Sequence, residues 1–337
     1  MSLSAQTQTG EATTEEKQKH WSRISESGTS MGIRFLAAIE KLFGRRVFSL
    51  ILVPTVAYFY IAKPIARRAS KDFLETHRAH FPNAWERKVS KRDVLRHLYA
   101  FGQSVLDKSL AWTTPIDEAL FDIPNKKQLE AFLNQPEGQL IIGSHFGNLE
   151  FCRGFVERYK AKTINILVYD RHAANFIKVM SEQSPESRVN VYQVDELDIP
   201  TILLLKTKLA QGEWCFIAGD RVPLSGDART TRVSFLSRKI DLPIGPYLLA
   251  KTLDCEVQLM FSYRLSINSY ERIRFVRIPF AKSIKVNRKN RDGDLNQLAQ
   301  RYADELAAQV EHAPYQWFNF FPYFASERAL DDTPPIV

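Results

Sequence analysis

A histidine and a glutamate follow one apolar run of this 337-residue chain. The run Leu140–Ile142 leads into Gly143, Ser144 and His145, and Glu150 comes five residues after the histidine. Within one continuous helix, this spacing corresponds to about 140° of rotation, so the two side chains would not share a face. With His145 in a turn and Glu150 in the first turn of a helix, the chain can bring them together. Glu150 would then accept the imidazole N–H, and the other ring nitrogen would take a proton from a hydroxyl group.

This pair would be a general base without a nucleophile of its own, because the substrate supplies the hydroxyl. Ser144 lacks the G-x-S-x-G surroundings of a nucleophilic serine. No second histidine or carboxylate follows at ligand spacing, so we expect no metal and no cofactor. A structural alternative stays open, in which His145 is hydrogen-bonded in the turn and Glu150 complements the helix dipole.

Apolar strands alternate with helices from about residue 125 onwards. This alternation predicts an α/β fold with a mostly parallel central sheet flanked by helices. Sites in such sheets form beyond the carboxyl ends of the strands, where His145 falls. The helix at 199–211 is well delimited, because Asp198 can cap it and Gly212 suits its end. The expected strands are Gln139–Ile142, Ile164–Tyr169, Val189–Val194, Trp214–Ala218, Glu256–Tyr263 and Arg272–Ile278, and the expected helices are 148–158, 173–181, 199–211, 244–253 and Asp294–Val310.

The N-terminal third has a different character. Met31–Phe43 alternates apolar and basic residues at helical spacing, and Val47–Ala62 has no charged residue but basic residues on both sides. Tyr58 and Tyr60 lie near one end of the uncharged run, as at a membrane interface. The run is shorter than the roughly 20 residues of a spanning helix, and Pro54 should kink it. We expect a membrane anchor that spans, re-enters or lies in the plane of the bilayer, with a buried core helix as the alternative.

The chain therefore divides into three predicted regions. Residues 1–18 are polar and form a disordered leader, with no secretory signal peptide. Residues 19–112 form a helical membrane-anchoring region that includes two amphipathic helices, Pro64–Phe81 and Lys91–Trp112. Residues 113–330 form the α/β domain.

The net charge of +8 favours acidic partners. The basic residues are scattered and no nucleic-acid motif appears, so we expect no nucleic acid partner. The three cysteines lie far apart and form no CxxC pair, which is typical of core residues in a reducing compartment.

The stretch from Ser144 to Glu150 resembles the H-X4-D/E motif of the lysophospholipid acyltransferase superfamily, specifically its lipid A biosynthesis (late acyltransferase) branch. Four further blocks resemble segments of that branch in the same order, so the resemblance extends over residues of about 30 to 325. These blocks are Val168–Arg171 with Asn175 downstream, Phe216–Arg221, Pro243–Ala250 and Pro314–Phe318.

The resemblance implies an acyltransferase for groups other than amino-acyl groups, located at the bacterial inner membrane with its catalytic domain facing the cytoplasm. It implies transfer of a fatty acyl group from a thioester, with acyl carrier protein as the expected donor and coenzyme A as the other option. The acceptor would be a hydroxyl of a lipid A-like membrane glycolipid. His145 would be the general base and Glu150 its partner. Arg171, Asp220 and Arg221 would hold the substrate's polar groups or shape the site, and Asn175 would be a further substrate-binding residue.

Several departures keep other acceptors open. Val233–Ser237 lacks the two aromatic residues and the glycine usual in the branch. The segment from His20–Arg23 through Gly32–Phe35 resembles members found with aryl polyene lipid biosynthesis. An aryl polyene lipid, a lysophospholipid or a catalytically silent lipid-binding relative are therefore alternatives. The arginines could instead be solvated surface charges, and Asp220 could cap backbone amides in its turn.

Overall fold

The structure is a computed structural model that describes residues 30–113, 117–160, 162–169, 174, 177, 181, 188–222, 229–266 and 272–324. The predicted leader at 1–18, the binding candidates Arg171 and Asn175, and most of the predicted helix at 173–181 lie outside the described residues.

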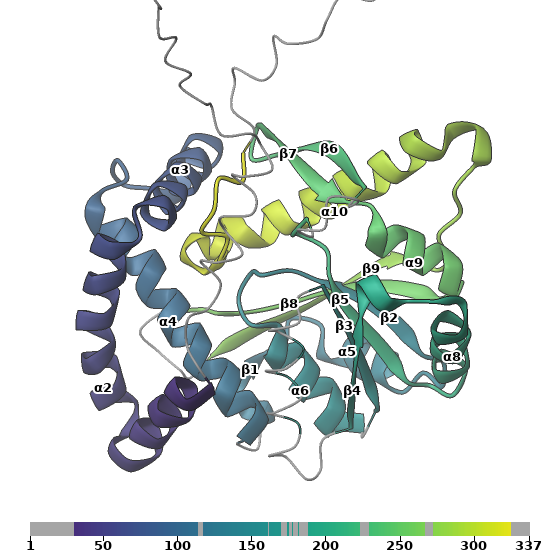
Figure 1. The fold of residues 1–337 in the computed structure, drawn as a ribbon, viewed down its shortest axis with the longest axis horizontal. Coiled ribbons are helices and arrows are strands. Elements are labelled where there is room, and N and C mark those ends of the chain that lie inside the picture. Colours follow the sequence, from purple (N-terminus) through teal and green to yellow (C-terminus); the bar gives the residue numbers. More distant parts are fainter. Residues whose placement is uncertain are drawn as a thin grey trace, which may run out of the picture.

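A seven-stranded sheet forms the centre of the molecule (Figure 1), in the order β1-β9-β8-β2-β5-β3-β4. All neighbouring strands are parallel except β8 and β9, which pair antiparallel. The predicted α/β class with a mostly parallel sheet is confirmed. The strands are β1 (Phe121–Asp122), β2 (Gln139–Gly143), β3 (Ile164–Val168), β4 (Val189–Gln193), β5 (Trp214–Ala218), β8 (Glu256–Arg264) and β9 (Ile273–Ala281).

Helices cover both faces of the sheet because the central strands are apolar on both sides. Ile141 and Phe216 pack toward α5 and α6, whereas Ile142 and Ile217 pack toward α8, α9 and α10. The N-cap predicted for α8 is confirmed, since the Asp198 side chain accepts a hydrogen bond from the Thr201 backbone N–H. The bounds are α5 (Lys126–Leu133), α6 (Leu149–Lys160), α8 (Ile199–Ala210), α9 (Gly245–Leu253) and α10 (Arg291–His312).

A separate hairpin of β6 (Thr230–Phe235) and β7 (Arg238–Pro243) packs beside α10 and was not predicted. Its two turn residues, Leu236 and Ser237, have positive φ angles of 50° and 63°. Such turns usually carry Asn or Gly, so the sequence lacked the ordinary hairpin signal.

Three helices form a layer at the left of Figure 1: α2 (Ser30–Ala62), α3 (Pro64–His80) and α4 (Lys91–Thr113). The helix breaks at Gly44, with φ 75° and ψ 169°, whereas Pro54 lies inside the helix, and the kink at Pro54 stays a prediction. Among the described residues, Gly44–Ala62 is one stretch that is long and apolar enough to cross a membrane.

The segment after α10 returns between this helical layer and the sheet. His97 of α4 is fully buried, and its Nε2 lies 2.9 Å from the carbonyl oxygen of Trp317. His77 of α3 is buried in the same way against the carbonyl oxygen of Val310, at 3.1 Å. These contacts join the N-terminal helices to the C-terminal segment, which in turn borders the loop after β2.

Candidate active site

The loop after β2 is held from two sides. The Gly147 N–H donates to the Gln316 carbonyl oxygen at 2.7 Å, and the Asn148 N–H donates to the Ser262 carbonyl oxygen at 2.8 Å. Gly147 has a φ of +66°, and a Cβ atom there would lie 1.9 Å from the Ser262 oxygen, so the close approach requires glycine. The loop conformation that presents His145 is thus fixed by backbone contacts to β8 and to the C-terminal segment.

His145 and Asp220 form the centre of the site. The Nδ1 atom of His145 lies 2.8 Å from Oδ1 of Asp220, and the His145 backbone N–H donates to the same carboxylate. Trp317 Nε1 and Asn319 Nδ2 each donate to Oδ2 of Asp220 at 3.2 Å. Asp220 is fully buried, whereas the His145 side chain is 31 % exposed. The buried carboxylate therefore holds the imidazole ring at Nδ1, and another part of the ring stays accessible to solvent.

The protonation states suit a base. Burial opposes the charge of Asp220, but the charge and hydrogen bonds of His145 and the charge of Arg221 outweigh it and lower the pKa of Asp220 to about 2. Burial and then the charge of Arg221 lower the pKa of His145. An ionised Asp220 accepts Nδ1–H, which leaves a lone pair on Nε2. Within the described residues, no hydrogen bond occupies Nε2, so this atom can receive a proton from a substrate.

Glu150 lies elsewhere than the predicted pair requires. Its Oε2 atom is 2.9 Å from Nε of Arg153, and the imidazole N–H that it was expected to accept goes to Asp220. Arg153 also stacks over the Trp112 ring at 3.6 Å and donates to the Ala111 carbonyl oxygen. Glu150 sits in the first turn of α6, where spacing alone could not separate contact with His145 from an i,i+3 pair with Arg153. In this structure Glu150 pairs with Arg153 of the same helix, and it is Arg153 that contacts the end of α4.

The two remaining described candidates, Asp220 and Arg221, were predicted to hold the substrate's polar groups or to shape the site, and in this structure both contact other residues of the chain. Asp220 is buried and oriented toward His145, so it positions the imidazole ring. Arg221 is tied to the C-terminal segment, with Nε 2.8 Å from Oδ1 of Asn319 and one terminal nitrogen 2.7 Å from the Phe318 carbonyl oxygen. Its charge still acts on His145, so Arg221 shapes the electrostatics of the site.

Five backbone N–H groups around the start of α6 already have acceptors in this structure. The backbone N–H groups of His145, Phe146, Gly147 and Asn148 donate to Asp220, Ser144, Gln316 and Ser262 respectively. The Glu150 N–H donates to the Asn148 side chain. These five groups are therefore unavailable to a substrate carbonyl oxygen in this conformation.

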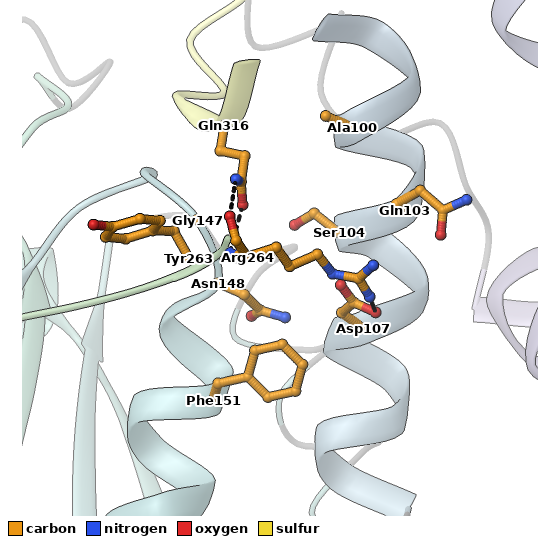
Figure 2. Close-up of a pocket in the computed structure, with 10 residues that line it drawn as sticks. All are labelled: Ala100, Gln103, Ser104, Asp107, Gly147, Asn148, Phe151, Tyr263, Arg264 and Gln316. Carbon is orange, nitrogen blue, oxygen red and sulfur yellow. Dashed lines mark hydrogen bonds and ion pairs between the residues drawn. The ribbon is translucent and has the colours of Figure 1, made fainter. Parts of the chain in front are cut away.

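A small cavity with polar and apolar lining residues lies between α4 and the loop (Figure 2). It offers about 10 Å³ to the centre of a water molecule, which is room for about one water. Arg264 crosses it to reach Asp107 of α4, and the Gln316 side chain bonds the Arg264 backbone at 2.8 and 2.9 Å. The cavity is on the α4 side of the loop and is too small for a lipid substrate. Its lining residues therefore hold the loop in place and do not form the substrate site.

The residues that sequence reasoning missed come from the C-terminal segment. Trp317 and Asn319 complete the donor set of Asp220, and the Phe318 N–H donates to the His145 carbonyl oxygen at 3.0 Å. The Pro314–Phe318 block was recognised as a signature but not as a partner of Asp220. In the part of the chain that the structure describes, no group of three or more His, Cys, Asp or Glu side chains could hold a metal ion.

Comparisons with known proteins agree with this arrangement. No curated protein matches the chain. A family model described as bacterial lipid A biosynthesis acyltransferase matches residues 14–326, which include the N-terminal helices, the His145 loop, Asp220 and the C-terminal segment. The chain therefore belongs to the bacterial lipid A biosynthesis acyltransferase family and is a lipid acyltransferase.

Proposed function

We propose that this enzyme transfers a fatty acyl group from acyl carrier protein to a hydroxyl of a lipid A-like glycolipid, at the cytoplasmic face of the bacterial inner membrane. The observation that carries the proposal is the buried Asp220 carboxylate at Nδ1 of a partly exposed His145. A lipid-binding relative without activity would not need an oriented imidazole with a lowered pKa.

In the proposed reaction, one atom acts first as a base and then as an acid. Nε2 of His145 takes the proton of the acceptor hydroxyl as its oxygen attacks the thioester carbonyl carbon. The carbonyl oxygen becomes an oxyanion in a tetrahedral intermediate. The carbon–sulfur bond then breaks, the sulfur leaves with the electron pair, and the imidazolium returns its proton to the thiolate. Asp220 stabilises the imidazolium between the two proton transfers.

We assign oxyanion stabilisation to positive charge, because five of the backbone N–H groups around the start of α6 are already bonded. Arg221 is the described cation whose charge has the largest effect on the pKa of His145. Its guanidinium is positioned by Asn319 and Phe318, so it needs no reorganisation as charge develops.

Two features support a carrier-bound donor. The chain has no G-x-x-x-x-G-K-[S/T] phosphate loop, so we expect it to receive an acyl group that is already activated. Acyl carrier proteins are acidic, and the net charge of +8 is complementary to them. Arg229 lies exposed before β6 and is the candidate contact, whereas Arg221 is engaged with the C-terminal segment.

Mass spectrometry of lipids from a deletion strain tests the acceptor most directly. We expect one class of lipid A-like glycolipid to lose one acyl chain, and wild-type protein but not folded His145→Ala protein to restore it. If the lost chain instead comes from an aryl polyene lipid or a phospholipid, the proposed acceptor is wrong and the acyl transfer chemistry stands. An unchanged lipid profile would contradict both.

A further inference from the structure

Helix α2 presents two different apolar faces. Phe48, Leu52 and Val56 recur at four-residue intervals and are 1 %, 7 % and 7 % exposed. A second set on the same helix remains in solvent, with Leu50 71 % and Ile61 74 % exposed. This second set, which we call the outer row, consists of Leu50, Val53, Tyr58 and Ile61. An apolar face of this length on a soluble surface indicates a partner that covers it.

The inner face of α2 lies along α4 over most of its length. One terminal nitrogen of Arg45 is 2.9 Å from Oδ1 of Asp107, at the start of the apolar stretch. The Gln103 side chain donates to Ser49 one turn later. At Gly102 the approach is so close that a Cβ atom would lie 2.5 Å from a Leu52 methyl carbon. The two helices therefore run side by side in opposite directions.

Helix α4 is itself fixed to the α/β domain along its length. Tyr315 donates to Asp93 at 2.8 Å near one end, and His97 meets Trp317 one turn later. Near the other end, Asp107 is bound by Arg264 of β8. Because α4 joins α2 to the α/β domain, the domain lies beside the entire stretch of α2 that could cross a membrane.

This arrangement conflicts with a spanning helix. A helix across the roughly 30 Å hydrocarbon core places everything packed beside it at the same depth. Here that would immerse α4 and α3 with their exposed cations, and charged side chains are rare in the hydrocarbon unless they are paired or face a polar interior. The exposed cations concerned are Arg68, Lys71, Lys91, Arg92 and Arg96.

We infer that α2 lies in the plane of one lipid leaflet, with the outer row among the acyl chains and α4 on the water side. The occupant of the outer row is a leaflet that contains anionic lipid, because exposed Arg46 and Arg68 flank the apolar stretch and Tyr58 has an amphipathic ring. This inference rests on the proposed function, because it presumes that the enzyme is attached to the inner membrane. It assigns an in-plane topology, with both ends of the helix on the same side of the bilayer.

The test counts labels on single molecules. A variant with Arg46→Cys and Ala62→Cys, two exposed positions roughly 24 Å apart along the helix, is prepared with Cys255→Ser. Cys152 and Cys215 are fully buried. The protein is reconstituted into vesicles of phosphatidylethanolamine and phosphatidylglycerol, treated with a membrane-impermeant maleimide, and analysed as intact protein by mass spectrometry. Labelling in detergent is the control and should give two labels.

An in-plane helix exposes both ends or neither, so molecules should carry two labels or none whatever their orientation. A spanning helix exposes one end, and a majority of singly labelled molecules would overturn the inference. Sedimentation with the vesicles is measured separately, so that failure of membrane association is distinguished from a wrong topology.

The occupant is tested with a fluorophore at two exposed positions. On Val53→Cys in the outer row it should be quenched strongly by phospholipid brominated at shallow acyl positions, and on Arg288→Cys, before α10, much less. Equal quenching would contradict insertion of the outer row. Absence of quenching at Val53 would assign the outer row to a protein, such as a second copy of the chain, and would also overturn the inference.

Discussion

Nδ1 of His145 lies 2.8 Å from Oδ1 of Asp220, although 75 residues separate the two in the chain. The same carboxylate accepts the backbone N–H of His145, so it fixes both the position of the loop and the orientation of the ring. Asp220 is thus the group on which the tautomer of the His145 imidazole depends.

Replacing Asp220 with Asn should lower kcat steeply. The amide keeps the size of the side chain but turns one acceptor oxygen into an N–H donor, which cannot accept from Nδ1. The imidazole would then carry its proton on Nε2, the wrong nitrogen for a base. We expect a loss of about 10²–10⁴-fold in transfer, measured with purified protein whose thermal unfolding is checked in detergent.

Glu150→Gln is the matched control for Asp220→Asn. It also removes one carboxylate charge, but it keeps an acceptor oxygen for Arg153 and leaves the ring of His145 untouched. We expect Glu150→Gln to retain more activity than Asp220→Asn. If Asp220→Asn retained more activity than Glu150→Gln, the partner of His145 would be Glu150 and not Asp220.

The pH dependence of kcat/KM should show a group with a pKa below the usual value for histidine. Burial and the charge of Arg221 lower the pKa of His145, so the imidazole stays neutral and able to accept a proton at lower pH. Removing the cation in Arg221→Gln should move the acidic limb toward higher pH. Arg288→Gln, at an exposed position before α10, should leave the limb in place. A limb that stays unmoved in Arg221→Gln would show that this cation does not act on the base.

Acidification should weaken the contact between the N-terminal helices and the C-terminal segment. Burial lowers the pKa values of His77 and His97 from 6.5 to about 4. Between these values the unfolded chain binds more protons than the folded one, so the free energy of unfolding falls as pH falls. For each imidazole the full loss is roughly 3 kcal/mol. His97→Gln can still donate to the Trp317 carbonyl oxygen but does not titrate, so denaturant unfolding should show a smaller slope with pH. An unchanged slope would contradict this assignment.

The donor should be recognised through exposed positive charge. Attraction between exposed charges is screened beyond roughly 8 Å at physiological salt. The KM for the carrier-bound thioester should therefore rise with salt more than the KM for the corresponding coenzyme A thioester. Arg229→Glu should reproduce this loss at low salt, whereas charge reversal at Arg221 would also disturb Asn319 and the base. Equal salt dependence for the two donors would exclude carrier recognition by this charge.

Local patterns were enough to predict most of the elements. The strand Trp214–Ala218 was predicted with the bounds that it has, and the cap at Asp198 was correct, because burial and capping depend on neighbours in the chain. The position of His145 at a strand end follows from the same kind of pattern. The hairpin turn at Leu236 and Ser237 was missed because its residues do not favour positive φ.

The partner of His145 could not be derived in this way. Glu150 is near in sequence, whereas Asp220 is near in space only because β2 and β5 are neighbours, with Gly143 opposite Ala218. Strand order is set by long-range packing, which a single sequence does not display. The same holds for Trp317 and Asn319, whose role depends on the return of the chain after α10.

Single-turnover transfer by purified His145→Ala protein measures how strongly the reaction depends on the His145 imidazole. The reaction contains the acyl carrier protein thioester and the acceptor glycolipid, and product is followed by mass spectrometry. Folding is verified by a thermal transition like that of the wild type, which we expect because the side chain is partly exposed. We expect transfer to fall by about 10²–10⁴-fold, the range for loss of a positioned base. Transfer at nearly the wild-type rate by the folded variant would contradict the assignment of His145 as the base.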